Sequence, residues 1–219
     1  MHLMREITML LRKDMILEWR QKYAISGILL YVLSTVFIVY TASVEIKAPT
    51  WNILFWIIIL FASVNANAKS FMQENSTRQL YYYSLVNPTA VIISKIIYNT
   101  ILLLVLSLLC FFVFGVIAGN PVKDFSMFLL ILLLGSLGFS ISFTFISAIA
   151  AKAHNSATLM TILSFPVVIP ILMTLIKLSA IALRLIQDTS VWKDVLILVG
   201  IDFLLIGLCL ILFPFLWRD

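Results

Sequence analysis

Few side chains in this sequence could carry out chemistry, and they do not form a recognisable catalytic set. The chain has no HExxH, GxSxG or GxxxxGK(S/T) motif. Nothing in it therefore predicts a zinc hydrolase, a serine hydrolase or a nucleotide-binding P-loop. We expect a non-catalytic protein with no directly bound cofactor or metal. Any ATP that it uses is expected to be hydrolysed by another polypeptide.

The two histidines and two cysteines favour structural roles over ligand roles. His2 lies near the start of the chain, and His154 lies in a short polar loop, where a histidine is more often solvated than bound to haem or a metal. Cys110 and Cys209 lie inside apolar runs without a CxxC or CxxCH motif. This pattern predicts two buried small hydrophobic side chains, and no disulfide, zinc site or covalent haem site.

One carboxylate, Asp202, falls inside an apolar run. An ionisable group at depth in a membrane is costly and by default marks a function or a buried partner. Asp202 lies seven residues beyond Val195, the predicted outer end of the last span, which is about 10 Å at about 1.5 Å per residue. The alternative is an interfacial Asp that pairs with Lys177 or Lys193 in the outer loop.

Two prolines four residues apart, Pro166 and Pro170, interrupt another apolar run within the segment FPVVIP. Each removes a helix hydrogen bond and bends or breaks the helix. In a membrane such breaks persist only where neighbours or water satisfy the freed carbonyls. The pair indicates either a bent helix beside a moving part or cavity, or a static kink. Together with Asp202, these prolines are our candidates for a transport pathway.

The longest polar stretch, Lys69–Lys95, offers a surface for a soluble partner. Aromatic side chains beside charged ones on one or two amphipathic turns are suited to fill a groove on a partner. The candidate contact residues are Phe71, Met72, Glu74, Arg78, Tyr81, Tyr82 and Tyr83. Pro88 disfavours helix at Asn87 and so ends this piece. Lys95, where the stretch ends, is expected to reach toward the headgroups. The alternative is a connector along the lipid headgroups, with its tyrosines in the interfacial belt.

Membrane helices must position these residues, because 63% of the chain is hydrophobic and only 11% is charged. Soluble domains carry about 45–50% apolar and about 25% charged residues. We predict an all-α polytopic membrane protein with a single domain over residues 1–219. The chain has a net charge of +5, and its basic residues lie at the predicted membrane edges. Anionic lipid headgroups account for basic residues there, so nucleic acid is not an expected partner.

A spanning helix needs about 20 predominantly apolar residues, and six runs meet this rule. They are roughly Ala24–Ser43, Trp51–Ala68, Ile96–Ala118, Phe125–Ala151, Leu159–Ile176 and Val195–Trp217. Lys177–Asp194 is expected to be a loop with a short interfacial helix. With the N-terminus inside, ten Lys and Arg residues fall on the inner side and five on the outer side. This bias predicts that both termini and the Lys69–Lys95 stretch are cytoplasmic.

Two further patterns concern packing. Residues 3–22, within an N-terminal segment of residues 1–23, place Ile7, Leu11, Met15 and Trp19 on one helix face, joined by Met4, with basic residues opposite. This predicts an amphipathic helix along the headgroups, with a coiled-coil arm as the alternative.

In the fourth span, Ser136, Ser140, Thr144 and Ala148 recur four apart. Such spacing lets helix backbones approach closely, within the chain or, alternatively, at a homodimer seam or a substrate-lining face.

The whole arrangement resembles the CcmB family, the membrane permeases of the haem-exporter-type ABC system for cytochrome c maturation. The residues that carry the resemblance are NPTAVIISKI after the polar stretch and FPVVIPILM in the fifth span. The resemblance implies an ABC-2-like permease in the bacterial inner membrane, acting as a dimer with two copies of the ATPase CcmA. It also implies association with CcmC, CcmD and the haem chaperone CcmE.

The resemblance further implies that ATP hydrolysis by CcmA is linked to release of haem-loaded CcmE from CcmC, with haem as a possible cargo. Carried over by position, Phe71–Tyr83 in the coupling segment, residues 69–95, would meet the ATPase, and residues 3–22 would be the elbow helix. The sequence departs from the family pattern at Glu74–Asn75–Ser76, where relatives tend to be more acidic and often have a glycine. The alternatives are an ABC-2 permease for a lipid, polysaccharide or drug, and a secondary transporter that uses Asp202 for proton coupling. The latter would show inverted repeats, which we do not see.

Overall fold

A computed structural model describes residues 2–20, 23–42, 46–72, 87–151, 156–187 and 190–218. Every regular element in these ranges is an α-helix. They are α1 (His2–Arg20), α2 (Tyr23–Ala42), α3 (Ala48–Met72), α5 (Pro88–Ala118), α6 (Phe125–Ala151), α7 (Ser156–Ala182) and α8 (Val191–Arg218). The all-α class predicted from composition is confirmed.

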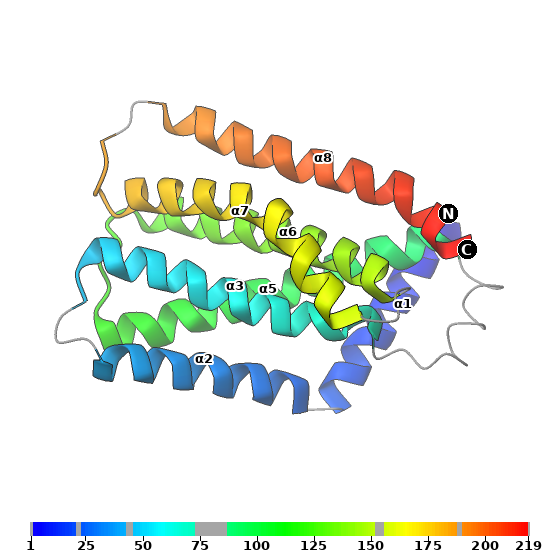
Figure 1. The fold of residues 1–219 in the computed structure, drawn as a ribbon, viewed down its shortest axis with the longest axis horizontal. Helices are drawn as coiled ribbons and strands as arrows, with labels where there is room; N and C mark the ends of the chain where they lie inside the picture. The colour runs from blue at the N-terminus through cyan, green and yellow to red at the C-terminus, as the bar shows by residue number, and fades with distance from the viewer. Residues whose placement is uncertain are drawn as a thin grey trace.

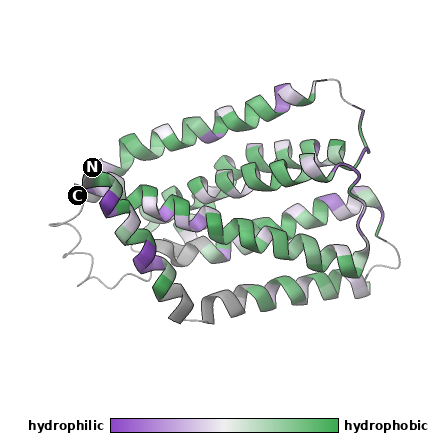
Figure 2. Ribbon diagram, turned by 180° about the vertical axis from the view of Figure 1, so that it is seen from behind, coloured by the Kyte–Doolittle hydropathy of each residue, from purple (hydrophilic) through white to green (hydrophobic). Residues whose placement is uncertain are grey.

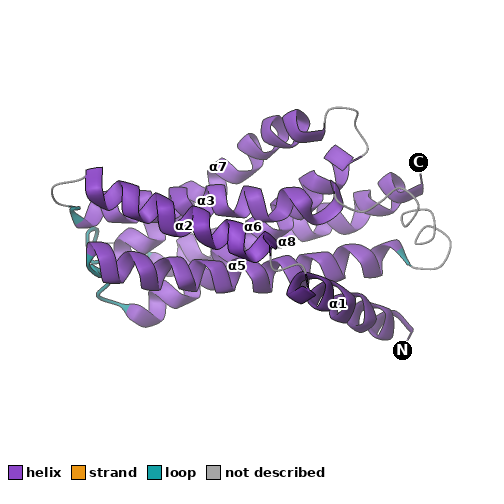
Figure 3. Cartoon of the chain, turned by 90° about the horizontal axis from the view of Figure 1, so that it is seen from below, coloured by secondary structure: helices purple, strands orange, loops and turns teal. Residues whose placement is uncertain are grey.

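Five helices in the described ranges, namely α3, α5, α6, α7 and α8, are long and apolar enough to cross a membrane. The apolar part of α2, Leu29–Ala42, is shorter. The long helices lie side by side, whereas α1 crosses one end of the bundle obliquely (Figures 1 and 3). Coloured by hydropathy, the long helices are largely hydrophobic and α1 is mixed (Figure 2). The chain is therefore a multi-pass membrane protein.

Both termini lie at the end of the bundle that also holds α1 (Figure 1). We call this the terminal end, and the opposite end, with the turn between α5 and α6, the far end. Because the long helices alternate in direction, α3 ends and α5 begins at the terminal end (Figure 1). The two elements that flank the predicted coupling segment are therefore beside α1.

The helix limits differ from the predicted spans mainly around the polar stretch. α6 has the predicted bounds, Phe125–Ala151. α5 begins at Pro88 instead of Ile96, because Asn87 caps it: its side chain accepts a hydrogen bond of 3.1 Å from the backbone N–H of Thr89. Proline suits the first helical position, where its missing N–H costs nothing. Lys69–Met72 likewise belongs to α3, so helices take both ends of the polar stretch.

The loop expected at Lys177–Asp194 is shorter than predicted, and its described residues do not form the expected short interfacial helix. α7 continues through Lys177 to Ala182, and α8 begins at Val191. The carbonyl of Ala182 accepts hydrogen bonds from the backbone N–H groups of Lys123 and Asp124, at 3.2 and 2.9 Å. The end of α7 is thereby joined to the α5–α6 turn, and Arg184, with φ of 58°, reverses the chain. These backbone bonds decide where the helix stops.

α6 is the central helix and packs against α3, α5, α7 and α8. The buried hydrophobic residues form two clusters. The main cluster joins α2, α3, α5, α6 and α7 with Leu198 of α8. The second cluster joins the first turns of α5, the second half of α6 and the last turns of α8. Its members are Val91, Ile92, Ile96, Ile141, Ala148, Cys209 and Phe213. The terminal end thus has a core of its own.

Candidate functional site

The predicted coupling residues are only partly within the described ranges. Phe71 and Met72 form the last turn of α3. Glu74, Arg78 and the three tyrosines, Tyr81, Tyr82 and Tyr83, lie outside the described residues, as does His154. What the structure does describe is the frame: α3 delivers the chain to this segment and α5 receives it, both at the terminal end (Figure 1).

α1, the predicted elbow helix, packs on this frame. Ile7 is buried, and Leu10 packs against the second cluster, beside the first turns of α5. Met4 and Met15, predicted on the same face as Ile7, are 71% and 52% exposed. The predicted apolar stripe is therefore divided: one edge contacts the protein and the other remains exposed. The side chain of Trp19 lies outside the described residues.

An ion pair joins α1 to α5. Lys95, expected to reach toward the headgroups, is instead only 7% exposed, with its Nζ 3.7 Å from Oδ2 of Asp14. Lys13 lies 3.1 Å from the other oxygen of the same carboxylate. The expectation was wrong because α1 covers the first turns of α5. α5, which begins at Pro88 within the predicted coupling segment, is thus attached to α1 by charge as well as by packing.

A row of hydrogen bonds, which we call the polar seam (Asn99, Ser107, Ser136, Ser140 and Thr144), joins α5 to α6. Asn99 donates to Thr144 Oγ1 at 2.8 Å, and Ser140 donates to the carbonyl of Ile96 at 2.9 Å. The hydroxyls of Ser107 and Ser136 lie 3.2 Å apart. The stripe of small residues in the fourth span is therefore buried within the chain, and its predicted role in close helix packing is confirmed.

Asp202 lies deeper than predicted. α8 begins four residues earlier than expected, so Asp202 is eleven residues beyond Val191, or about 16 Å along the helix. It is 2% exposed, and neither carboxylate oxygen has a hydrogen-bond partner among the described residues. Lys177 pairs instead with Asp194, at 2.6 Å. The alternative of an interfacial ion pair with a loop lysine is therefore wrong for Asp202.

Gly138 is the residue at which Asp202 and the proline helix meet. A Cβ atom on Gly138 would lie 2.6 Å from Oδ1 of Asp202 and 3.4 Å from Cγ2 of Ile171, the residue after Pro170. In the sequence, Gly138 is one of several small residues in its span. The signal it offered was a glycine near the middle of a long apolar helix, but its contacts could not be read from the sequence.

The prolines do bend α7. The helix continues through Pro166 and Pro170 and changes direction between its two halves (Figure 1). Both prolines are exposed on the outer face, while Val168 and Ile171 are buried on the inner one. Thr174 donates to the carbonyl of Pro170 at 2.8 Å. The prolines therefore act on the core through the bend and do not line a described cavity.

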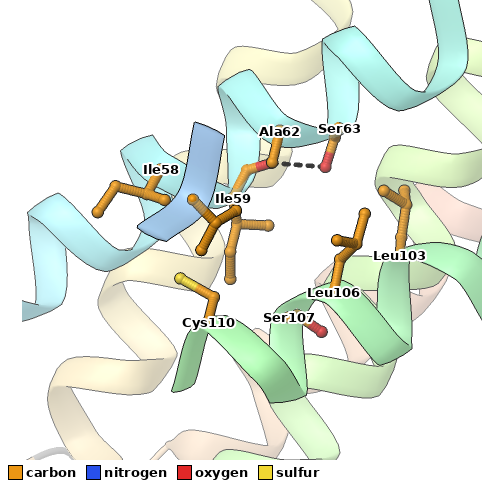
Figure 4. Close-up of a pocket in the computed structure, with 9 residues that line it drawn as sticks. Ile58, Ile59, Ala62, Ser63, Leu103, Leu106, Ser107 and Cys110 are labelled. Atoms are coloured by element: carbon orange, nitrogen blue, oxygen red, sulfur yellow. Dashed lines mark hydrogen bonds between the residues drawn. The ribbon is translucent and has the colours of Figure 1, made fainter. Parts of the chain in front are cut away.

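A pocket between α2, α3 and α5 is too small for a cargo. Its volume is about 10 Å³, and its lining is almost wholly apolar, which is space for about one water molecule. Figure 4 shows Ile59, Ala62, Leu106 and Cys110 around it. Within the described residues, no group of three His, Cys, Asp or Glu side chains could hold a metal. In the part of the chain that the structure describes, the site thus offers contacts between helices and a buried carboxyl.

Comparison with protein families gives one match. The sequence model of a family described as CcmB protein matches residues 5–216. No curated protein matches the chain. The matched range includes α1 from Arg5 onward, the segment between α3 and α5, the bent helix α7 and Asp202.

Proposed function

The chain belongs to the CcmB family, and we propose that it couples ATP hydrolysis by a separate ATPase to haem export, or to release of a haem-loaded chaperone. Members of this family are permease components of a haem-exporting ABC transporter in cytochrome c biogenesis, in which a partner hydrolyses ATP. The family match over residues 5–216 is the observation that carries the proposal.

We propose that the ATPase docks on the coupling segment, through Phe71, Met72, Glu74, Arg78 and the three tyrosines. The frame around the segment supports this. α5, which receives the chain from it, is attached to α1 by the Asp14–Lys95 pair and to α6 by the polar seam. A displacement of the segment would therefore move α5 together with two neighbouring helices. α6, one of these two helices, carries Gly138, the residue at which α6 meets the bent α7 and Asp202.

The arrangement in the membrane follows from the proposal. α2 has 20 residues, enough for a sixth span. With six spans both termini lie on one side, and the positive-inside rule places that side in the cytoplasm. The family implies an ABC ATPase and other Ccm components as partners. We propose a homodimer in the bacterial inner membrane, with a CcmA-like ATPase and with CcmC-, CcmD- and CcmE-like proteins, surrounded by lipid.

Co-purification tests the docking proposal. The full chain, extracted in mild detergent, is expected to retain a P-loop ATPase, and Glu74→Ala with Arg78→Ala to release it without loss of membrane insertion. Phe203→Ala, which changes a 70% exposed side chain on α8, is the matched control. Retention of the ATPase by the double variant would exclude this contact.

A strain that lacks the protein tests the cargo separately. We expect it to lose its c-type cytochromes. Normal c-type cytochromes in that strain would favour the other candidate, an ABC-2 permease for a lipid, polysaccharide or drug.

A further inference from the structure

The face by which α8 packs on the bundle contains an acid where its neighbours are apolar. The buried residues of α8 are Asp194, Leu198, Asp202, Cys209 and Phe213. Their spacings of four and seven place them on one helix face. Leu198 belongs to the main cluster, and Cys209 and Phe213 belong to the second. Asp202 thus lies in the seam between α8 and α6, where the two hydrophobic clusters adjoin.

The elements around Asp202 supply no counter-charge. α6 has no acidic, basic or histidine side chain between Phe125 and Ala151. On α7, Lys177 is paired with Asp194. On α5, Lys95 is paired with Asp14, and the other titratable groups are Tyr98 and Cys110. On α8 itself they are Lys193, Asp194, Cys209 and Arg218. None of these donates to either oxygen of Asp202.

Gly138 explains why the carboxyl fits this place. The Cβ position of Gly138 is 2.6 Å from Oδ1 of Asp202, closer than a real carbon atom could lie. A side chain at residue 138 would therefore displace the carboxyl from its present position against the backbone of α6. The carboxyl of Asp202 is therefore held between α6 and α8 and does not point toward lipid or water.

We infer that Asp202 is a proton-binding site, in which the contact between α6 and α8 holds the carboxyl in its neutral, protonated form. A buried carboxylate with neither a cation nor a donor avoids the large cost of burying a charge by taking up a proton. Release of the proton needs water or a cation at the oxygens. Since α6 covers them, α8 must first move away from Gly138. Opening of the α6–α8 seam and release of the proton are thus linked.

Infrared spectroscopy tests this directly on the full chain in vesicles of phosphatidylethanolamine and phosphatidylglycerol. At neutral pH the difference spectrum between the wild type and Asp202→Asn is expected to contain the carbonyl stretch of a carboxylic acid. Asp194→Asn is the matched control: this acid lies on the same face of α8 but has a lysine partner, so its removal is expected to leave the band unchanged. A carboxylate band in the Asp202→Asn difference spectrum would overturn the inference.

Thermal stability gives a second measurement. A proton held more tightly in the folded state makes the folded state lose stability as the pH rises, by up to about tenfold in the folding equilibrium constant per pH unit. The wild type is therefore expected to lose Tm relative to Asp202→Asn as the pH rises above about 4, the ordinary value for an aspartate. Parallel curves would contradict the inference. If Asp202→Asn does not accumulate, aspartate isotope-labelled at its carboxyl allows the acid band to be read in the wild type and in Asp194→Asn.

Discussion

A cluster of stacked and tilted aromatic rings distinguishes the far end of the bundle from the terminal end. At the far end, five rings that we call the aromatic cluster (Trp51, Phe55, Phe111, Phe114 and Phe128) fill the space between α3, α5 and α6. Trp51 stacks on Phe55 and on Phe114, each with ring centroids 5.1 Å apart. The far end also has polar contacts, because Asn52 and Trp56 share hydrogen bonds with Ser179 and Lys177 pairs with Asp194. Toward the terminal end, the polar seam and the Asp14–Lys95 pair join the helices together with the second hydrophobic cluster.

The difference indicates which end can rearrange. Close-packed rings have one good arrangement and lose contact when they shift. Hydrogen bonds and ion pairs can exchange their partners for water, and interhelical hydrogen bonds in membranes contribute only about 0.6 kcal/mol on average. The aromatic cluster is therefore suited to be a fixed anchor. The terminal end, beside the proposed docking segment, is suited to change its packing. Four experiments test this contrast.

The largest effect is expected at the anchor. Trp51→Ala removes two stacked contacts and leaves a large cavity, at a cost of about 3–5 kcal/mol in the free energy of unfolding. Phe112→Ala, at a 70% exposed position on α5, is the control and is expected to change little. Thermal denaturation in detergent measures both. A small loss for Trp51→Ala would show that the far end is not the more rigid one.

Gly138→Ala is expected to come next. The new methyl group would lie 2.6 Å from Oδ1 of Asp202, and such overpacking costs about 1–3 kcal/mol. Gly200→Ala on α8, where a Cβ meets nothing within 4 Å, is the matched control. Adding Asp202→Ala to Gly138→Ala should relieve the clash. If the double variant is no more stable than the sum of the single losses predicts, the two residues are not in contact.

The link between α1 and α5 can be measured with a double-mutant cycle. Asp14→Asn and Lys95→Met each break the ion pair, whereas the combined variant leaves no lone buried charge from this pair. The coupling energy is expected to be about 0.5–3 kcal/mol. Strictly additive losses would show that the pair does not join the two helices.

The smallest effect is expected in the polar seam. Thr144→Val removes the acceptor for Asn99 and should cost about 0.6 kcal/mol, and at most about 1.7 kcal/mol. Thr174→Val, which loses only a bond within its own helix, is the control. If the polar seam rearranges during transport, Thr144→Val should change the ATPase activity of the complex more than it changes Tm. Unchanged activity would assign the seam a purely structural role.

The sequence by itself determined the class of the protein and the approximate limits of its helices. A membrane requires apolar segments of a given length with satisfied backbone groups, so composition was enough to place α6 within its bounds. Local chemistry would also have placed the start of α5, because Asn87 followed by Pro88 is a capping residue with a proline at the first helical position. We interpreted Asn87–Pro88 instead as the end of the helical turns within the polar stretch before it.

Only the tertiary structure decided which helix faces meet. Lys95 is paired with Asp14, and Asp202 lies against Gly138, although each pair is distant in sequence. The physical reason is that a membrane helix is apolar on its lipid-facing side as well as inside. Hydrophobicity therefore does not mark the buried face as it does in water. The role of a lone carboxyl within an apolar run then depends on what packs over it, and here that is a glycine of another helix.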